Sequence, residues 1–220
     1  MKNSDYVFKE IDGKLEFIGD FESLYKNEDD PWKQSAANGE MRDYYLHSRK
    51  RLTDQLKKFN CNSLLEIGCG LGYTTNDIQR SLPNTKVLGM DISATAVTKA
   101  QKLFPHLNFL EGNISSSDLS LEKKHDVVIL NQLLWYILEP LLTSLENCFT
   151  LLTAGGRVIF SQAFLQSPQR YRTDICEGFD GLINYLSNNM GHMFKIEYAN
   201  FDDSGPFVHD DGLIILRKIQ

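Results

Sequence analysis

The sequence predicts an α/β fold built on a mostly parallel sheet of seven strands, with helices on both faces of the sheet. Short apolar runs recur from residue 63 onward, and each run ends at a polar residue or a glycine. Segments long enough for helices separate these runs, which is the pattern of successive βαβ units. A glycine-rich stretch follows the first run directly, as expected where a strand turns into a helix beside a ligand.

Seven apolar runs are the candidate strands. In chain order they are residues 63–67, 86–91, 107–112, 126–131, 157–162, 192–200 and 212–219. The first five alternate with longer segments and should form a parallel sheet. The last two runs would extend the same sheet.

Four helices are predicted from the residues at their ends. They cover residues 39–59, 74–82, 93–104 and 139–156. Threonines open the second helix and Ser93 opens the third, and both residue types are suited to N-caps. The fourth helix has Pro140 at its start and Gly155 at its end, which is the usual punctuation of a helix. The first helix carries its apolar residues roughly on one face.

Length and composition indicate one folded domain. The chain has 220 residues, of which 42% are hydrophobic and 24% charged, and a single core can serve up to about 250 residues. The four cysteines have neither metal-ligand nor disulfide spacing, so we expect free thiols and no metal. No apolar run approaches the ~18 residues of a membrane span. We therefore expect a cytoplasmic protein without a membrane partner.

The formal net charge is −6, so the sequence predicts no broad basic surface. Electrostatic binding of nucleic acid is therefore not expected. A neutral or cationic small molecule suits this charge better as a partner. The sequence leaves the oligomeric state open.

The stretch LLEIGCGLGYTT, residues 64–75, carries the strongest functional signal. Gly68 and Gly70 would let the backbone approach a ligand that a Cβ atom would block. The spacing differs from the G-x-G-x-x-G of nicotinamide and flavin sites, because an aromatic residue stands at the sixth position. Glu66 would repel a pyrophosphate and favour a cation. Cys69 lies inside the loop, where only its backbone need matter.

The second predicted strand ends at Asp91, 21 residues after Gly70. A carboxylate at that edge of the sheet can accept hydrogen bonds from both hydroxyls of a ribose. An adenosine with a positively charged tail and no phosphate matches S-adenosylmethionine. We therefore expect S-adenosylmethionine as the cofactor.

These residues resemble the class I S-adenosylmethionine-dependent methyltransferases, over roughly residues 63–162. The first motif of that family is E-x-G-x-G-x-G, and its second strand ends in an acidic residue. The resemblance implies a Rossmann-like sheet with one antiparallel strand near the C-terminus. It further implies an N-terminal helical lid and helix, residues 1–60, packed on a methyltransferase domain, residues 61–220, as one structural unit.

The resemblance also implies which residues bind the cofactor. They are Trp32, Glu66, Gly68, Cys69, Gly70, Asp91, Ile92, Asn113, Ile114 and Asn131. The segments FLEGNIS and DVVILNQLLWYI resemble those that contact the adenine and the methyl group. Asn113 stands where the family usually has an aspartate, although an amide can still hydrogen-bond the edge of the base.

A narrower resemblance lies outside this core. The segments FESLYKNEDDPW and NQLLWYIL look like the Nod-factor and amino-sugar N-methyltransferase group, in which a D-P-W turn helps to cover the cofactor. In this chain the turn ends at Trp32, which would either cover the cofactor or simply fill the core. Gln132 stands where that group commonly has a glutamate.

The candidates for catalysis are Tyr136, His192 and His209. Asn131, Trp135 and Tyr136 follow the fourth strand, at the edge where ligands usually bind, and we expect them to line the site. The two histidines are candidates for proton transfer because an imidazole titrates near neutrality.

The expected reaction is methyl transfer to a small molecule by in-line displacement, in which a nitrogen or oxygen lone pair attacks the activated methyl. We favour an amine of a sugar or related metabolite, because a hydroxyl would need a committed base or a metal. An O-methyltransferase of a sugar or secondary metabolite is the alternative. A cofactor-binding module without catalysis is a third possibility, and a segment long enough for a lid argues against it.

Overall fold

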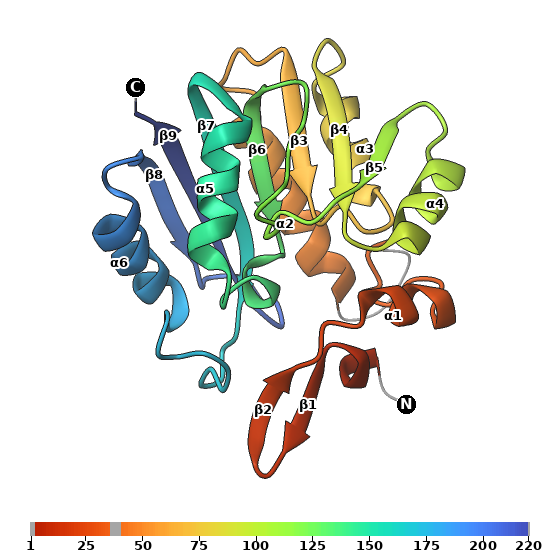
Figure 1. The fold of residues 1–220 in the computed structure, drawn as a ribbon, viewed down its shortest axis with the longest axis vertical. Helices are drawn as coiled ribbons and strands as arrows, with labels where there is room; N and C mark the ends of the chain where they lie inside the picture. The colour runs from red at the N-terminus through yellow and green to blue at the C-terminus, as the bar shows by residue number, and fades with distance from the viewer. Residues whose placement is uncertain (1–2, 36–40, 220) are drawn as a thin grey trace.

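A mixed sheet of seven strands runs through the middle of the protein, and helices cover both of its faces (Figure 1). The computed structural model describes residues 3–35 and 41–219. The strands follow the order β5-β4-β3-β6-β7-β9-β8 across the sheet. Their bounds are β3 Ser63–Ile67, β4 Lys86–Asp91, β5 Asn108–Glu111, β6 His125–Asn131, β7 Leu152–Phe164, β8 Phe194–Asp202 and β9 Asp210–Lys218.

Strand β9 runs against both of its neighbours. It pairs antiparallel with β7 and with β8, whereas the pairs from β5 through β7 are parallel. A short connection, residues 203–209, joins β8 to β9, and adjacent strands joined in this way run antiparallel. The predicted Rossmann-like sheet, mostly parallel with one antiparallel strand near the C-terminus, is confirmed.

The helices form one layer on each face of the sheet. Helices α2 and α3 pack on one face, α5 and α6 pack on the other, and α4 lies beside β5 (Figure 1). Their bounds, with two short 3₁₀ helices, are η1 Asn3–Tyr6, α2 Met41–Leu56, α3 Tyr73–Ser81, α4 Ala94–Leu103, η2 Leu134–Tyr136, α5 Leu141–Leu151 and α6 Gly178–Met190. The predicted start at Ser93 is confirmed, because its hydroxyl caps α4.

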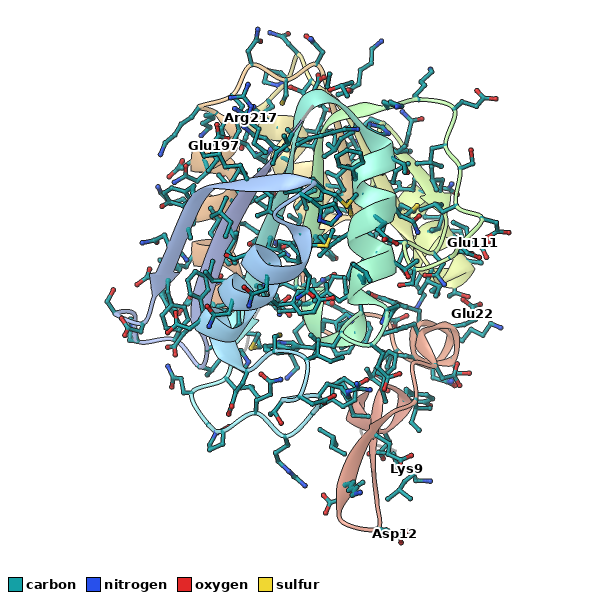
Figure 2. All side chains as sticks on the ribbon, turned by 60° about the vertical axis from the view of Figure 1, so that its left-hand side comes forward. Lys9, Asp12, Glu22, Glu111, Glu197 and Arg217 are labelled. Carbon is teal, nitrogen blue, oxygen red and sulfur yellow. The ribbon has the colours of Figure 1, made fainter. Side chains whose placement is uncertain are left out.

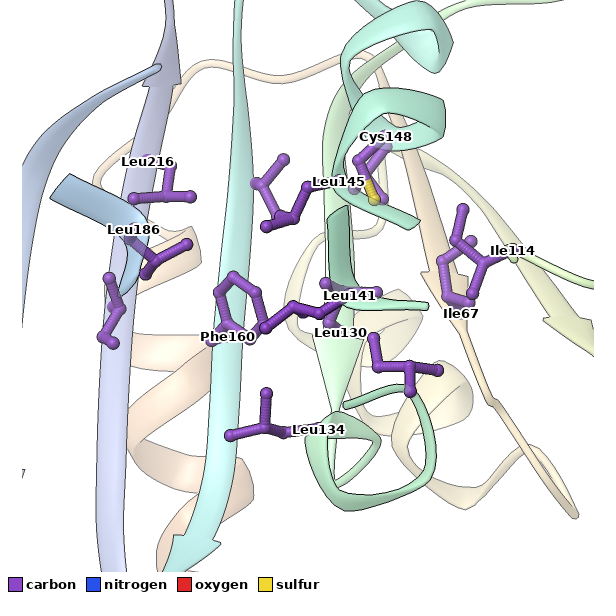
Figure 3. Close-up of a cluster of buried hydrophobic side chains, with 14 of the residues drawn as sticks. Ile67, Ile114, Leu130, Leu134, Leu141, Leu145, Cys148, Phe160, Leu186 and Leu216 are labelled. Atoms are coloured by element: carbon purple, nitrogen blue, oxygen red, sulfur yellow. The ribbon is translucent and has the colours of Figure 1, made fainter. Parts of the chain in front are cut away.

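Each central strand contributes side chains to two hydrophobic cores, because successive side chains point to opposite faces of the sheet. Leu65 and Leu130 face α5 and α6. There they join Leu145 and Leu186, and Figure 3 shows this core between the sheet and the two helices. Leu64 faces α2 and α3 instead. Burial of such a side chain contributes about 1.5–3 kcal/mol, so the two cores hold the carboxyl ends of the parallel strands at one edge.

Two helix ends differ from the predictions. Helix α5 ends at Leu151, and β7 begins at once with the fully buried Leu152. The predicted end at Gly155 is wrong, because that glycine lies in the first part of β7, where the register against β6 shifts. Helix α3 begins at Tyr73 after Gly72 and has no side-chain cap, so the predicted threonine caps are also wrong.

The N-terminal segment differs from the predicted helical lid. It contains a β-hairpin, β1 Phe8–Ile11 and β2 Lys14–Phe17, and then helix α1 Phe21–Asn27. Asp12 and Gly13 form the turn with positive φ at both residues, as a type I′ turn requires. Figure 2 shows Lys9 and Asp12 on this hairpin, which projects from the body of the protein. The segment is therefore part strand and part helix.

Several predictions fall partly outside the described residues. Positions 39 and 40 of the helix predicted at 39–59 lie outside them, as do parts of the units 1–60 and 61–220, so this division stays a prediction. No described helix is long and apolar enough to cross a membrane. Within residues 3–35 and 41–219, no group of three or more His, Cys, Asp or Glu is placed to hold a metal ion. The cytoplasmic location and the absence of metal and nucleic acid stay predictions.

Candidate functional site

A cavity of about 460 Å³ opens at the carboxyl ends of β3, β4, β6 and β7. Ligand sites commonly enclose about 300–1,000 Å³. The strand order reverses between β3 and β6, which is where α/β sheets usually bind ligands. Seven of the predicted cofactor residues line this cavity: Trp32, Gly68, Asp91, Ile92, Asn113, Ile114 and Asn131. The other three, Glu66, Cys69 and Gly70, are not among the residues that line it.

The glycine loop packs closely against the end of β4. The main-chain N–H groups of Gly68 and Cys69 both donate to the Met90 carbonyl, at 2.7 and 3.0 Å. Gly68 has a φ of +70°, and a Cβ atom there would stand 2.8 Å from Leu133 Cδ1. The backbone angle therefore favours glycine, and a Cβ atom would also displace the Leu133 side chain. The Cys69 thiol is buried outside the cavity, so this residue contributes its backbone alone.

Asp91 holds the glycine loop and the start of α4 while it faces the cavity. Its carboxylate accepts hydrogen bonds from the main-chain N–H groups of Gly70, at 2.8 Å, and Ser93, at 2.9 Å. Burial raises the pKa of this carboxyl, and the N–H groups of Ser93 and Gly70 oppose the shift. A carboxylate offers about four acceptor positions, so Asp91 can accept further hydrogen bonds from a ligand hydroxyl.

Glu66 is buried behind the glycine loop, with 1% of its surface exposed. Thr75 Oγ1 donates to one carboxylate oxygen at 2.5 Å, and Asn131 Nδ2 donates to the other at 3.2 Å. Burial raises the pKa of Glu66 to about 7, against the effect of these two hydrogen bonds. The structure thus corrects the expectation of direct ligand contact, because Glu66 uses its oxygens to fix α3 and the end of β6.

One wall of the cavity is largely aliphatic. Ile92 and Ile114 line it, and Ile92 leaves 49% of its surface exposed. Asn113 lies in the same wall, and its Oδ1 accepts a hydrogen bond from the Ser115 N–H at 2.9 Å, which fixes the turn after β5. Aliphatic side chains beside an amide suit a flat ring with apolar faces and a polar edge.

Aromatic side chains from the N-terminal segment and from η2 close one side of the cavity. The ring centroids of Trp32 and Tyr136 are 5.7 Å apart, and Trp32 Nε1 donates to Tyr25 Oη at 3.1 Å. Phe17 of the hairpin and Phe21 of α1 also pack on Tyr136, with centroids at 6.3 and 5.2 Å. Burial raises the pKa of Tyr136, so its phenol stays protonated near neutral pH. Tyr136 therefore lines the site but is unsuited to accept a proton.

The two candidate histidines lie at opposite ends of the parallel strands. His209 lines the cavity, and its ring centroid is 5.7 Å from that of Tyr44. Burial lowers the pKa of His209, against the attraction of Asp210, so the imidazole is neutral near neutral pH. His192 lies in an exposed turn between α6 and β8, at the amino ends of the parallel strands. The catalytic role predicted for His192 is wrong because of this position.

The structure also brings to the site residues for which no role was predicted. Gln34 lines the cavity, and its Oε1 is buried without a hydrogen-bond partner in the described part of the chain. Arg49 of α2 donates to the Gln34 carbonyl at 2.5 Å. Asp30 of the D-P-W turn accepts a hydrogen bond from the Gln34 N–H at 2.8 Å. The D-P-W turn was the sequence signal for this position, because an aspartate that accepts hydrogen bonds from the N–H groups after it fixes the path of the residues that follow.

The stretch from β3 to β7 matches a known family. A model described as a methyltransferase domain covers residues 65–158. These residues are similar to that family, and we refer to them as the methyltransferase domain. The glycine loop, Asp91, Asn113 and Asn131 all lie within it.

Two curated relatives of the methyltransferase domain are malonyl-(acyl-carrier protein) O-methyltransferases. The protein of Ilyobacter polytropus is 30% identical over 127 residues, which cover 54% of this chain and 46% of that protein. The protein of Bacillus anthracis is 29% identical over 175 residues, which cover 70% of this chain and 64% of that protein. The chain therefore spans only about half to two thirds of the length of these relatives.

A solved structure with the same fold is the N-methyltransferase NodS from Bradyrhizobium japonicum, in complex with S-adenosyl-L-homocysteine. It has a TM-score of 0.68 and 18% identity, over 90% of this chain and 98% of that chain. The likeness shows that the fold is shared. Together with the match of the methyltransferase domain, it agrees with the resemblance to class I S-adenosylmethionine-dependent methyltransferases.

Replacing Asp91 with alanine should weaken binding of S-adenosylhomocysteine about 10–100-fold, because a hydrogen bond to a charged group contributes about 1.5–3 kcal/mol. Isothermal titration calorimetry measures this change, and a thermal unfolding curve checks that the variant folds. Asp180→Ala removes an exposed carboxylate on α6 outside the cavity and is the matched control. Unchanged affinity in Asp91→Ala would show that the ribose assignment is wrong.

Glu66 should make the stability depend on pH. Its pKa rises from 4.5 to about 7 on folding, so the folded state binds this proton more tightly than the unfolded chain. The stabilisation is complete below pH 4.5 and is lost as the pH rises to about 7, a change of about 3 kcal/mol. Glu66→Gln should abolish this loss, so urea titrations of the two proteins should diverge over that range. Parallel pH profiles would contradict the expectation.

Proposed function

We propose that the protein is an S-adenosylmethionine-dependent methyltransferase that methylates an amine of a small molecule, such as a sugar or related metabolite, by in-line displacement. The observation that carries this proposal is the makeup of the acceptor half of the cavity, which we define by Trp135, Gln162, Leu165 and His209. It adjoins the cofactor half and combines a neutral imidazole with apolar and amide side chains.

The residues of the cofactor half fit S-adenosylmethionine. Asp91 would accept hydrogen bonds from the ribose, and Ile92 and Ile114 would cover the faces of the adenine. The Gln34 Oε1, buried without a partner among the described residues, would accept from the cationic amino group. When bound, the cofactor supplies an activated methyl group whose C–S bond breaks as the acceptor nitrogen forms the new C–N bond.

The charges around the cavity favour an amine over a carboxylate as acceptor. Asp91 and Glu139 are the carboxylates among the described lining residues, and none of those lining residues is a lysine or arginine. Arg172, near the rim, already pairs with Glu139 at 2.8 Å and with Asp174 at 2.9 Å. A carboxylate acceptor, such as the malonyl group that the relatives' names specify, would lack a cationic partner here.

His209 is the proposed proton acceptor. A protonated amine must lose a proton before its lone pair can attack, and a neutral imidazole can take that proton from the nitrogen. The lowered pKa of His209 keeps it in the neutral form. Trp32 and Tyr136, with Phe17 of the hairpin packed on Tyr136, would cover the site and exclude water.

Transfer to an oxygen is the second candidate, and the names of the curated O-methyltransferases favour it. A hydroxyl acceptor is a weaker nucleophile than an amine, so His209 would then have to act as a committed base. A cofactor-binding module without catalysis is not favoured, because the cavity continues beyond the cofactor half.

Incubation with methyl-labelled S-adenosylmethionine tests the proposal directly. The panel pairs amino sugars and other small amines with the matching alcohols and carboxylic acids. We expect label on nitrogen, identified by mass spectrometry of the products. Label found on oxygen alone would reject the amine assignment, and no transfer to any member would reject the enzyme activity for these classes.

Replacing His209 with alanine should lower kcat about 100-fold, because general base catalysis typically contributes about 10²-fold or more. His192→Ala is the matched control, since it removes the same side chain from an exposed turn at the far edge of the sheet. Steady-state kinetics on the best amine measures both effects. Equal losses, or none in His209→Ala, would exclude His209 as the proton acceptor.

A further inference from the structure

Gln132 has a left-handed backbone conformation, which other contacts in the structure must stabilise. It follows the last residue of β6, lines the cavity and has a φ of +55°. A residue with a Cβ atom adopts this left-handed conformation at a cost of about 1–3 kcal/mol, and such strained positions persist where the surrounding structure determines them. The main-chain N–H of Gln132 donates to the Ser161 carbonyl at 2.8 Å, which is one of the restraints.

The side-chain amide of Gln132 supplies the other restraints. Its Oε1 accepts a hydrogen bond from the Ala163 N–H of β7 at 2.8 Å. Its Nε2 donates to Tyr44 Oη at 3.0 Å and to Ser48 Oγ at 3.3 Å, both on α2. Both ends of the amide are therefore engaged, and it bridges α2 to β7 across the end of β6.

The chain of hydrogen bonds has one direction. Asp211 is 1% exposed, pairs with Arg51, and can only accept, so the Tyr44 hydroxyl donates to Asp211 Oδ1, at 3.0 Å. The Tyr44 oxygen is then free to accept from the Gln132 amide. Burial raises the pKa of Tyr44, so the phenol keeps the proton that this arrangement needs.

The same tyrosine contacts the proposed proton acceptor. The His209 ring meets the Tyr44 ring edge-on, with centroids 5.7 Å apart, and His209 lies two residues before Asp211. Tyr44 is fully buried and therefore has a fixed position. Its ring and its hydroxyl together set where His209 and Gln132 stand relative to each other.

We infer that Tyr44 and Gln132 are positioning residues for methyl transfer, which fix the strained end of β6 and the His209 imidazole in the acceptor half of the cavity. This inference rests on the proposed function. It also explains why an amide, rather than the carboxylate of the similar sugar N-methyltransferases, suits position 132. A glutamate would have no N–H for Tyr44, whose single proton already goes to Asp211, and would add a second negative charge nearby.

The first test is Tyr44→Phe, which removes the hydroxyl and keeps the ring. We expect kcat for the amine to fall about tenfold, as for one lost buried hydrogen bond, while the affinity for S-adenosylhomocysteine stays unchanged. Tyr198→Phe on β8, outside the cavity, is the matched control. Equal kcat in Tyr44→Phe and the wild type would overturn the inference.

The second test reverses the direction of the hydrogen bonds. Gln132→Glu alone should lower kcat about 100-fold, since it sets a charged acceptor against the Tyr44 oxygen in place of a donor. Adding Asp211→Asn should recover part of this loss, because an amide at 211 can donate to Tyr44 and the phenol can then donate to position 132. Asp202, 3.9 Å from Arg51, remains to pair with that arginine. A double variant no better than Gln132→Glu would count against the directed chain.

A readout without turnover separates this inference from the proposed function. The NMR resonances of the His209 ring should shift in Tyr44→Phe and in Gln132→Glu but not in Tyr198→Phe. Unmoved resonances in both variants would overturn the positioning role even if the wild type methylates amines. Shifted resonances with no methyl transfer by the wild type would support the positioning of His209 and reject the proposed function.

Discussion

The hydrogen bonds of the buried Glu66 carboxylate are the junction on which the site depends. They join β3, which carries Glu66, to α3 through Thr75 and to β6 through Asn131. The junction lies where the strand order reverses, so it fixes the glycine loop relative to the strand that leads into the acceptor half. A buried carboxyl with a raised pKa is not a source of stability near neutral pH. Its contribution is the fixed spacing of three elements around one cavity.

The two halves of the cavity come from different parts of the chain. The cofactor half is built mostly by the methyltransferase domain, residues 65–158, together with Trp32 and Gln34 from the N-terminal segment. The acceptor half and its cover use the hairpin, α2, the end of β7 and the start of β9, most of which lie outside those residues. Similarity across the methyltransferase domain is therefore evidence about which cofactor is bound far more than about which acceptor is methylated. An amine acceptor is therefore supported by the charges of the lining residues and by His209.

The sequence predicted the elements whose signals are local. The βαβ strands were placed within a few residues, because each is a continuous apolar run that the sheet buries on both faces. The hairpin was missed, since each of its strands has only four residues and two of them are charged, although the Asp12–Gly13 turn was a usable signal. The positions of Gly68 and Asp91 at the site were predicted from the spacing of the glycines and from the distance along the chain to the end of the next strand. Glu66 and His192 were misplaced because sequence alone shows neither that Thr75 occupies a carboxylate oxygen nor which edge of the sheet a turn reaches.

The position of β9 has a consequence for how the protein is made. β9 lies between β7 and β8 although it follows both in the sequence, so β8 has no neighbour in the sheet until β9 inserts. His209 immediately precedes β9 and reaches the cavity only with it. During synthesis on the ribosome the earlier strands can already pair, because domains fold as their sequences emerge. The nascent chain can thus form the part of the cavity around the glycine loop first, and His209 joins the cavity only when β9 is in place.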